Sequence, residues 1–145
     1  MARVEKSIEV RAPPEKVWEM LALDRFPEWL DECKSSEYTS EIRTPEDKYR
    51  VGASAHIIEK HVKYDLEITE SLENEKITTR SKGMPVTMTV TFLLESVEEG
   101  TKLTYVMDWR GLGIFGKISD KLGGEKHAEK GIEKSLNNLK SILEK

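Results

Sequence analysis

The segment from Gly111 to Gly116 carries the glycine spacing of a dinucleotide-binding loop. It reads GLGIFG, follows a strand-like stretch and precedes a helix-like one. In dinucleotide-binding proteins, such glycines belong to a parallel strand–helix–strand unit, with an acidic residue about 20 positions further on. Here the chain after Gly116 is expected to be helical to its end, so no second parallel strand follows. We therefore predict no NAD binding, and we expect the glycines to turn the chain from a sheet into a terminal helix.

His56 and His61 are the candidate metal ligands. Both fall on one predicted strand, and His61 is five positions after His56, an odd offset, so they point to opposite faces of a sheet. No cysteine or acidic cluster completes a tetrahedral zinc site around either of them. The sequence therefore predicts no metal site, although His56 remains a candidate hydrogen-bonding group inside a cavity.

Cys33 is the only cysteine, and it follows Asp31 and Glu32. Neighbouring carboxylates disfavour the thiolate, so Cys33 is not expected to act as a nucleophile. The sequence also lacks the Gly-x-Ser-x-Gly elbow of serine hydrolases and the Walker loop of nucleotide-binding proteins. No catalytic residue is predicted.

Methionine and aromatic side chains gather on the apolar faces of the last two predicted strands. They are Met88, Tyr105, Met107 and Trp109. Ordinary core packing explains such a cluster, but methionine also lines adaptable pockets because it repacks around different ligands. A pocket of this kind is mostly apolar and holds a few polar groups that orient the ligand. The polar candidates are Tyr38, His56, Thr79, Tyr105 and the indole of Trp109.

A sheet of short antiparallel strands is expected to position these residues. Apolar and polar residues alternate in the segments 3–10, 86–97 and 101–109, as is typical of half-buried strands. Further strands are predicted at 34–42, 53–62, 63–72 and 75–81, with short turns such as Glu98 to Gly100. Two short helices are expected after the first strand, one from Ala12 with prolines in its first turn and one from Pro27.

The segment 117–145 is predicted to form a long helix. Its apolar residues recur at helical spacing, and they are Ile118, Leu122, Ile132, Leu136, Leu139 and Leu143. Lysines and glutamates occupy the other face, which is typical of a solvated, self-paired surface. Gly123 and Gly124 interrupt the pattern, and they mark either a simple break between two helices or a hinge beside a cavity.

Composition excludes several classes of protein. The chain of 145 residues has a net charge of −4, so it lacks the basic excess that nucleic-acid binding requires. No apolar run approaches the ~20 residues of a membrane span, and MARVEKSIEV is not a secretory signal. Together with the single cysteine, these features predict one cytoplasmic domain, residues 1–145, without integral membrane contact. The lack of glutamine and the abundance of Glu and Lys resemble proteins of thermophiles.

Several short motifs occur in a characteristic order along the whole chain. They are APPEKVWEML (12–21), PEWL (27–30), Val51-Gly52, GTKLTY (100–105), GLGIFGKI (111–118) and SLNNLKSILEK (135–145). In this order the chain resembles the START and birch-pollen-allergen (SRPBCC) superfamily, nearest its polyketide cyclase/dehydrase-like branch. The resemblance implies an α+β helix-grip fold, in which a curved antiparallel sheet of six to seven strands surrounds a long C-terminal helix. It also implies two short helices after the first strand and a cavity between sheet and helix.

Members of this superfamily typically bind or carry hydrophobic small molecules, and some are enzymes. We predict binding or transport of such a molecule (a lipid, quinone or polyketide-like compound), because no pair of titratable residues falls plainly on the inner faces. One alternative is a cyclase or dehydratase that uses His56 or Tyr105 as an acid–base group. Another is a protein-interaction or assembly factor with a vestigial cavity. The oligomeric state stays open, and no cofactor is predicted. The predicted ligand-binding residues are Tyr38, His56, Leu66, Ile68, Thr79, Met88, Val90, Tyr105, Met107, Trp109, Ile118 and Leu122.

Overall fold

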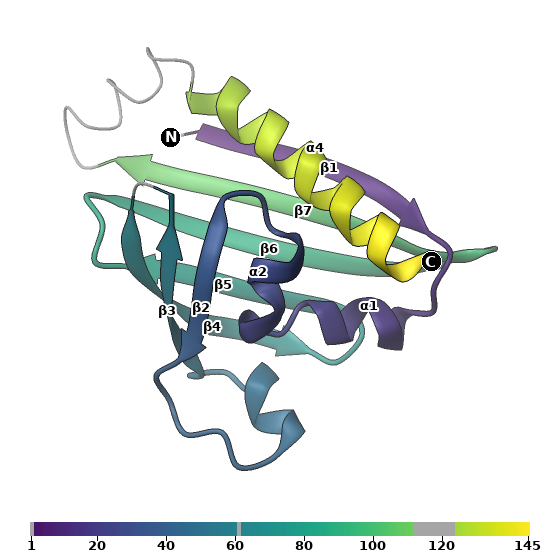
Figure 1. Cartoon of the computed structure of the whole chain (residues 1–145), viewed down its shortest axis with the longest axis horizontal. Helices are drawn as coiled ribbons and strands as arrows, with labels where there is room; N and C mark the ends of the chain where they lie inside the picture. Colours follow the sequence, from purple (N-terminus) through teal and green to yellow (C-terminus); the bar gives the residue numbers. More distant parts are fainter. Residues whose placement is uncertain (1, 61, 112–123) are drawn as a thin grey trace.

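The computed structural model describes residues 2–60, 62–111 and 124–145. Its framework is an antiparallel sheet of seven strands in the order β1-β7-β6-β5-β4-β3-β2 (Figure 1). The strands are β1 (Ala2–Val10), β2 (Cys33–Tyr38), β3 (Ser54–Glu59), β4 (Lys63–Leu72), β5 (Lys76–Lys82), β6 (Val86–Val97) and β7 (Gly100–Gly111). The curved antiparallel sheet expected from the sequence is confirmed. β7 pairs antiparallel with both β1 and β6, so the strand before GLGIFG is not part of a parallel unit.

The alternation of apolar residues decides which face of the sheet is inside. Val90 pairs with Met107 and Phe92 pairs with Tyr105, and all four side chains lie on the face that carries the core. The threonines between them on β6 point the other way, as the period of two requires. The pairing of the strands brings their inward-facing residues together on one concave surface.

Three short helical segments connect β1 to β2, where the sequence predicted two. They are α1 (Pro14–Met20), η1 (Leu23–Arg25) and α2 (Phe26–Trp29). Pro14 lies in the first turn of α1, where its missing N–H costs no hydrogen bond. Trp29 is buried, and its indole N–H donates to the Met20 carbonyl at 2.8 Å. This bond ties α2 to the end of α1.

The strand predicted at 34–42 is too long, because β2 ends at Tyr38. The chain then forms the 3-10 helix η2 (Pro45–Tyr49), which the sequence did not predict. Pro45 begins it, and the Asp47 carboxylate accepts hydrogen bonds from the backbone N–H groups of Arg43 and Thr44. A carboxylate at the start of a helical turn satisfies N–H groups that have no backbone partner there.

The terminal helix α4 (Gly124–Leu143) packs mainly against β1 and also contacts α1 and α2 (Figure 1). Ile132, Leu136 and Leu139 are its buried stripe, as the helical spacing predicted. Lys6, which interrupts the apolar face of β1, reaches α4 and pairs with Glu133 at 3.3 Å. The sheet and this helix form the expected helix-grip arrangement. The predictions for Ile118, Leu122 and the hinge glycine Gly123 lie outside the described residues.

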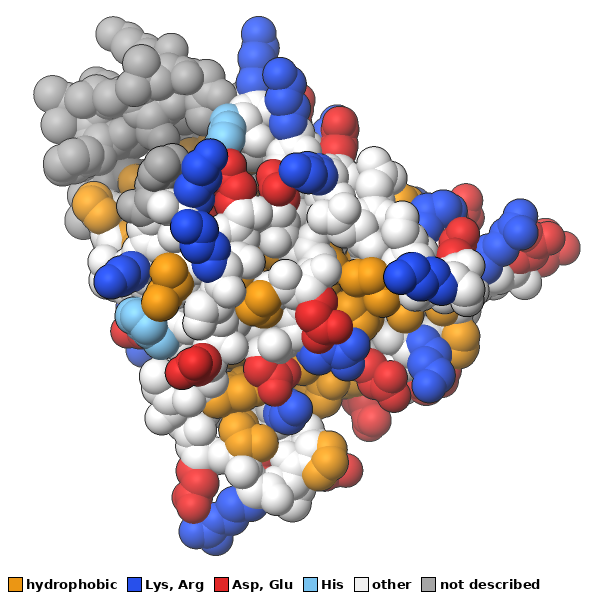
Figure 2. All heavy atoms as spheres, viewed as in Figure 1, with side chains coloured by type: hydrophobic (Ala, Val, Ile, Leu, Met, Phe, Trp, Pro, Cys, Tyr) orange, Lys and Arg blue, Asp and Glu red, His pale blue; other side chains and the backbone are white. Residues whose placement is uncertain are grey.

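Charged side chains of both signs are interspersed on the face that Figure 2 shows. This distribution agrees with the net charge of −4 and presents no continuous basic surface on that face. Within the described residues, no helix combines the length and the apolar character that crossing a bilayer requires.

Candidate functional site

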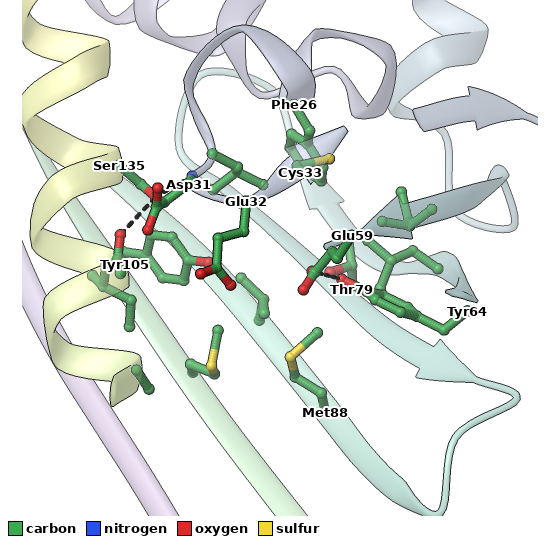
Figure 3. Close-up of a pocket in the computed structure, with 18 of the residues that line it drawn as sticks. Phe26, Asp31, Glu32, Cys33, Glu59, Tyr64, Thr79, Met88, Tyr105 and Ser135 are labelled. Atoms are coloured by element: carbon green, nitrogen blue, oxygen red, sulfur yellow. Dashed lines mark hydrogen bonds between the residues drawn. The ribbon is translucent and has the colours of Figure 1, made fainter. Parts of the chain in front are cut away.

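A cavity of about 210 Å³ lies between the concave face of the sheet, the turn after α2 and the first half of α4 (Figure 3). We define it by its wall: Phe26, Leu30, Asp31, Glu32, Cys33, Ile57, Glu59, Tyr64, Leu66, Thr79, Met88, Val90, Phe92, Tyr105, Met107, His127, Ala128, Gly131, Ile132 and Ser135. Ligand pockets for drug-sized molecules measure roughly 300–1,000 Å³. This cavity therefore suits a smaller molecule.

Half of the residues predicted to bind a ligand lie on this wall. They are Leu66, Thr79, Met88, Val90, Tyr105 and Met107. These six residues belong to β4, β5, β6 and β7. Their side chains face the cavity because each occupies an inward-facing position of its strand. The two methionines are half-buried and supply adaptable apolar surface beside Val90 and Phe92.

One end of the cavity is polar, and Glu59 is its central group. Glu59 follows Ala55 and Ile57 in the inward phase of β3, and its carboxylate accepts a hydrogen bond from the Tyr64 hydroxyl. Burial raises the pKa of Glu59, the hydrogen bond from Tyr64 lowers it, and the nearby charge of Glu32 raises it further. The net direction is upward, as expected for a carboxyl group in apolar surroundings.

Thr79 and Tyr105 add two hydroxyl groups to the wall. Thr79 is 1% exposed, and its Oγ1 has no hydrogen-bond partner among the described residues. Tyr105 is buried, and burial raises the pKa of its hydroxyl, as does the charge of Glu59. Both hydroxyls therefore stay protonated at neutral pH and can donate or accept hydrogen bonds.

The mouth of the cavity is formed where the turn after α2 meets α4. The Asp31 N–H donates to the Ser135 hydroxyl at 2.8 Å, and the Asp31 carboxylate pairs with Lys134 at 3.3 Å. Glu32 takes a left-handed conformation with φ 66° and lies 3.8 Å from His127 Nε2. These contacts join segments that are about a hundred residues apart in the sequence.

Cys33 lies on the same wall, and its surroundings keep the thiol protonated. Burial raises its pKa to about 11, and the charge of Glu59 acts in the same direction. The Sγ atom donates weakly to the Ser35 carbonyl at 3.8 Å. A thiol with this pKa is not an activated nucleophile, in agreement with the sequence analysis.

The prediction that His56 faces the cavity is wrong. Its side chain is 46% exposed and its Nδ1 lies 2.9 Å from the Asp65 carboxylate on the outer face of the sheet. The reason is the phase of β3, which turns Ala55, Ile57 and Glu59 inward and His56 outward. His61, the other histidine considered, lies outside the described residues.

Three other predicted residues lie away from the wall of this cavity. The Tyr38 hydroxyl accepts from the Leu23 N–H at 3.0 Å and donates to the Lys48 carbonyl at 2.8 Å, so it ties η1 to η2. Ile68 and Trp109 are buried on the concave face, but they belong to the core beyond the cavity. Ile118 and Leu122 lie outside the described residues.

The expectation that no titratable pair lies on the inner faces is also wrong, because Glu59 and Tyr64 are hydrogen-bonded there. The signal for this pair is present in the sequence. Glu59 is in phase with Ile57, and Tyr64 is in phase with Leu66 and Ile68. The acidic residues at the mouth carry no such periodic signal, because they lie in a turn.

The unpartnered hydroxyl of Thr79 leads to a prediction about stability. Replacing Thr79 with valine should raise the free energy of unfolding of the ligand-free protein by about 1 kcal/mol, because a buried hydroxyl without a partner is removed. Urea unfolding measures the change.

Thr101 provides the matched control, because it is equally buried but its hydroxyl donates to the Ala12 carbonyl at 2.7 Å. Thr101→Val should lower the free energy of unfolding by about 1–3 kcal/mol, since a buried acceptor loses its donor. If both substitutions destabilise the protein equally, the Thr79 hydroxyl is satisfied in the folded state and our description of it fails.

Solved structures share this fold at low sequence identity. Protein MLL2253 from Mesorhizobium loti is 20% identical with a TM-score of 0.72, and the match covers 99% of this chain and 97% of that one. The Aha1 dimer from Colwellia psychrerythraea is 19% identical with a TM-score of 0.72, covering 99% and 96%. Bacillus halodurans protein BH1534 is 19% identical with a TM-score of 0.72, covering 99% and 97%. These matches establish the fold alone.

Comparison with curated proteins gives no match. In contrast, the sequence model of one family, described as polyketide cyclase / dehydrase and lipid transport, matches residues 1–144. The match extends over every strand of the sheet and over α4, and therefore over every element that forms the cavity. This chain belongs to the polyketide cyclase/dehydrase and lipid transport family.

Proposed function

We propose that residues 1–145 act as one domain that binds a small hydrophobic molecule in the cavity under α4. The observation that carries the proposal is the cavity itself, about 210 Å³ in volume, in which Met88, Val90, Phe92 and Met107 face a few convergent polar groups. Apolar walls with a small number of placed polar groups are typical of ligand sites. The family, whose description includes lipid transport, supports the same class of ligand.

A second candidate is acid–base catalysis in the same cavity, and the Glu59–Tyr64 pair favours it. Burial raises the pKa of Glu59 in the direction of neutral pH. General acid–base catalysis is most efficient when the pKa of the catalytic group is close to the working pH. The two functions differ in what Glu59→Gln changes. In an enzyme, the substitution abolishes turnover of a bound substrate, whereas in a carrier it changes only affinity.

The third candidate, a protein-interaction or assembly factor, needs no open cavity. The open volume next to Tyr105 and Thr79 therefore supports ligand binding over this role. The fold is shared with the Aha1 dimer of Colwellia psychrerythraea, but at 19% identity that likeness carries no function across.

Binding of an apolar fluorescent probe tests the proposed function. We expect saturable binding that changes tryptophan emission, because Trp29 packs against Phe92 and Tyr105 of the wall at centroid distances of 5.5 and 6.4 Å. Native mass spectrometry of the purified protein is the companion measurement, and it should reveal a copurifying small molecule. Failure to bind any probe or lipid, whatever its chain length, removes the main support for the proposal.

Substitution of a wall methionine locates the binding. Met107→Ala enlarges the cavity and should change probe affinity, with a loss of stability near the low end of the ~2–5 kcal/mol range for such truncations. Met84→Ala is the matched control, since Met84 packs on the core away from the cavity wall. Equal effects of the two substitutions on affinity would place the probe elsewhere.

A further inference from the structure

The charges on the cavity wall are strongly one-sided. Among the described residues that form the wall, Asp31, Glu32 and Glu59 carry carboxylates, and none is a lysine or arginine. The single basic residue is His127 at the mouth, whose side chain is 79% exposed. A carboxylate or phosphate ligand entering this cavity would therefore be repelled by like charges. It would also lose its hydration shell, and no lysine or arginine among the described residues of the wall would offset that desolvation cost.

Glu59 differs from the two acidic residues at the mouth. Asp31 is paired with Lys134, and Glu32 lies next to His127. Glu59 makes no ion pair within the described part of the chain, and its one side-chain partner is the neutral hydroxyl of Tyr64. A carboxylate accepts up to about four hydrogen bonds, so Glu59 keeps unused acceptor positions toward the cavity.

Thr79 is an independent sign of a missing ligand group at the same end of the cavity. Its hydroxyl is buried, lies on the wall and has no partner among the described residues. Glu59, Tyr64 and Thr79 come from β3, β4 and β5, which are neighbours in the sheet, and Figure 3 shows their side chains gathered at one end of the cavity. A hydroxyl with an open acceptor lone pair and a carboxylate with unused acceptor positions, both on the wall of one cavity, suit a ligand with more than one N–H donor.

We infer that the ligand carries a protonated amine on a small apolar body. The ammonium group donates hydrogen bonds to the Glu59 carboxylate and the Thr79 hydroxyl, next to the ring of Tyr105. The apolar part packs on Met88, Val90 and Met107. An ammonium supplies the counter-charge that Glu59 lacks, and hydrogen bonds between charged groups are the strong ones. An aromatic ring beside it adds a cation–π attraction. This inference rests on the proposed binding function.

Three probes with the same hydrocarbon chain separate the inference from the proposed function. Hexylamine, hexanol and hexanoate are titrated at pH 7, where the amine is protonated like a lysine side chain. We expect hexylamine to bind about tenfold or more tightly than hexanol, as one charged hydrogen bond predicts. Hexanoate should bind most weakly. If hexanol or hexanoate binds as well as hexylamine, the amine inference is overturned and ligand binding stands. If none of the three binds, both are overturned.

Isosteric variants assign the effect to Glu59 and Thr79. Glu59→Gln should reduce hexylamine affinity about tenfold and hexanol affinity by a much smaller factor, and Thr79→Val should also reduce hexylamine affinity by a smaller factor. Glu37→Gln is the matched control, because Glu37 is an exposed residue of β2 on the outer face and the substitution removes the same charge. Circular dichroism verifies that each variant is folded. Equal affinities for hexylamine in Glu59→Gln and Glu37→Gln would overturn the assignment, and Thr79→Val gives an independent answer if the first variant does not fold.

Discussion

Replacing Trp29 with alanine should lower the free energy of unfolding by about 3–5 kcal/mol, the usual range for truncating a buried aromatic residue. Trp29 is 1% exposed and packs edge-on against Phe26 and Phe92. Its indole N–H donates to the Met20 carbonyl, which would be left without that donor. Domains are stable by roughly 5–15 kcal/mol, so the substitution removes a large share of the total. Urea unfolding at a constant slope measures the loss.

Trp29→Phe separates packing from hydrogen bonding in this effect. The phenyl ring keeps much of the contact with Phe92 and Tyr105, but it has no N–H for the Met20 carbonyl. We expect a loss of about 1–3 kcal/mol, the cost of one unsatisfied buried acceptor. A loss below about 1 kcal/mol for Trp29→Ala would show that α2 is not part of the packed core.

Gly100→Ala should be the most damaging of the glycine substitutions. Gly100 begins β7 beside the end of β1, where an added Cβ would collide with the Val10 carbonyl oxygen and lie 3.0 Å from the Ala12 nitrogen. The colliding atoms belong to the backbone, so they cannot move aside without separating β1 from β7. We expect a loss of about 3 kcal/mol or more, at or beyond the upper end of ordinary overpacking.

Gly131→Ala is the matched control for this prediction. Gly131 lies inside α4, and the nearest atom to an added Cβ is an Asp31 carboxylate oxygen at 4.0 Å. Alanine should therefore stabilise the helix by about 1 kcal/mol. Thermal unfolding of the two variants should show shifts of opposite sign. If Gly100→Ala is tolerated as well as Gly131→Ala, the close approach of β1 to the β6–β7 turn is not as described.

The sequence predicted most elements of the fold because their periodicity is local. Alternation along 86–97 and 101–109 is sufficient to identify β6 and β7, and the helical spacing of Ile132, Leu136 and Leu139 identifies α4. The two 3-10 helices were missed, since segments of three to five residues carry no periodic signal. The strand predicted at 34–42 extends four residues beyond the end of β2 at Tyr38, because no periodic signal marks where the strand stops.

The candidate site was harder to predict, because it depends on register between strands. Strand alternation predicts Met88, Val90, Tyr105 and Met107 on an inner face, the family resemblance adds the cavity, and all four lie on its wall. Thr79 was only a polar candidate, and it lies there too. The convergence of Glu59 with Tyr64 also requires the pairing of β3 with β4, which no local pattern specifies. The prediction for His56 is wrong because alternation along β3 turns Ile57 and Glu59 inward and His56 outward. The Asp31–Ser135 contact at the mouth spans a separation in sequence that only the folded structure reveals.

Methyl NMR of the methionines tests most directly whether the cavity binds a small apolar molecule. The chain has five methionines, of which Met88 and Met107 line the cavity, whereas Met20 and Met84 pack elsewhere in the core. With ¹³C-methyl labelling and assignment by Met→Leu variants, titration with hexylamine should shift the Met88 and Met107 signals along one saturable curve. The Met20 and Met84 signals should stay in place. Unmoved Met88 and Met107 signals up to the solubility limit, or equal shifts at all methionines, would contradict the account.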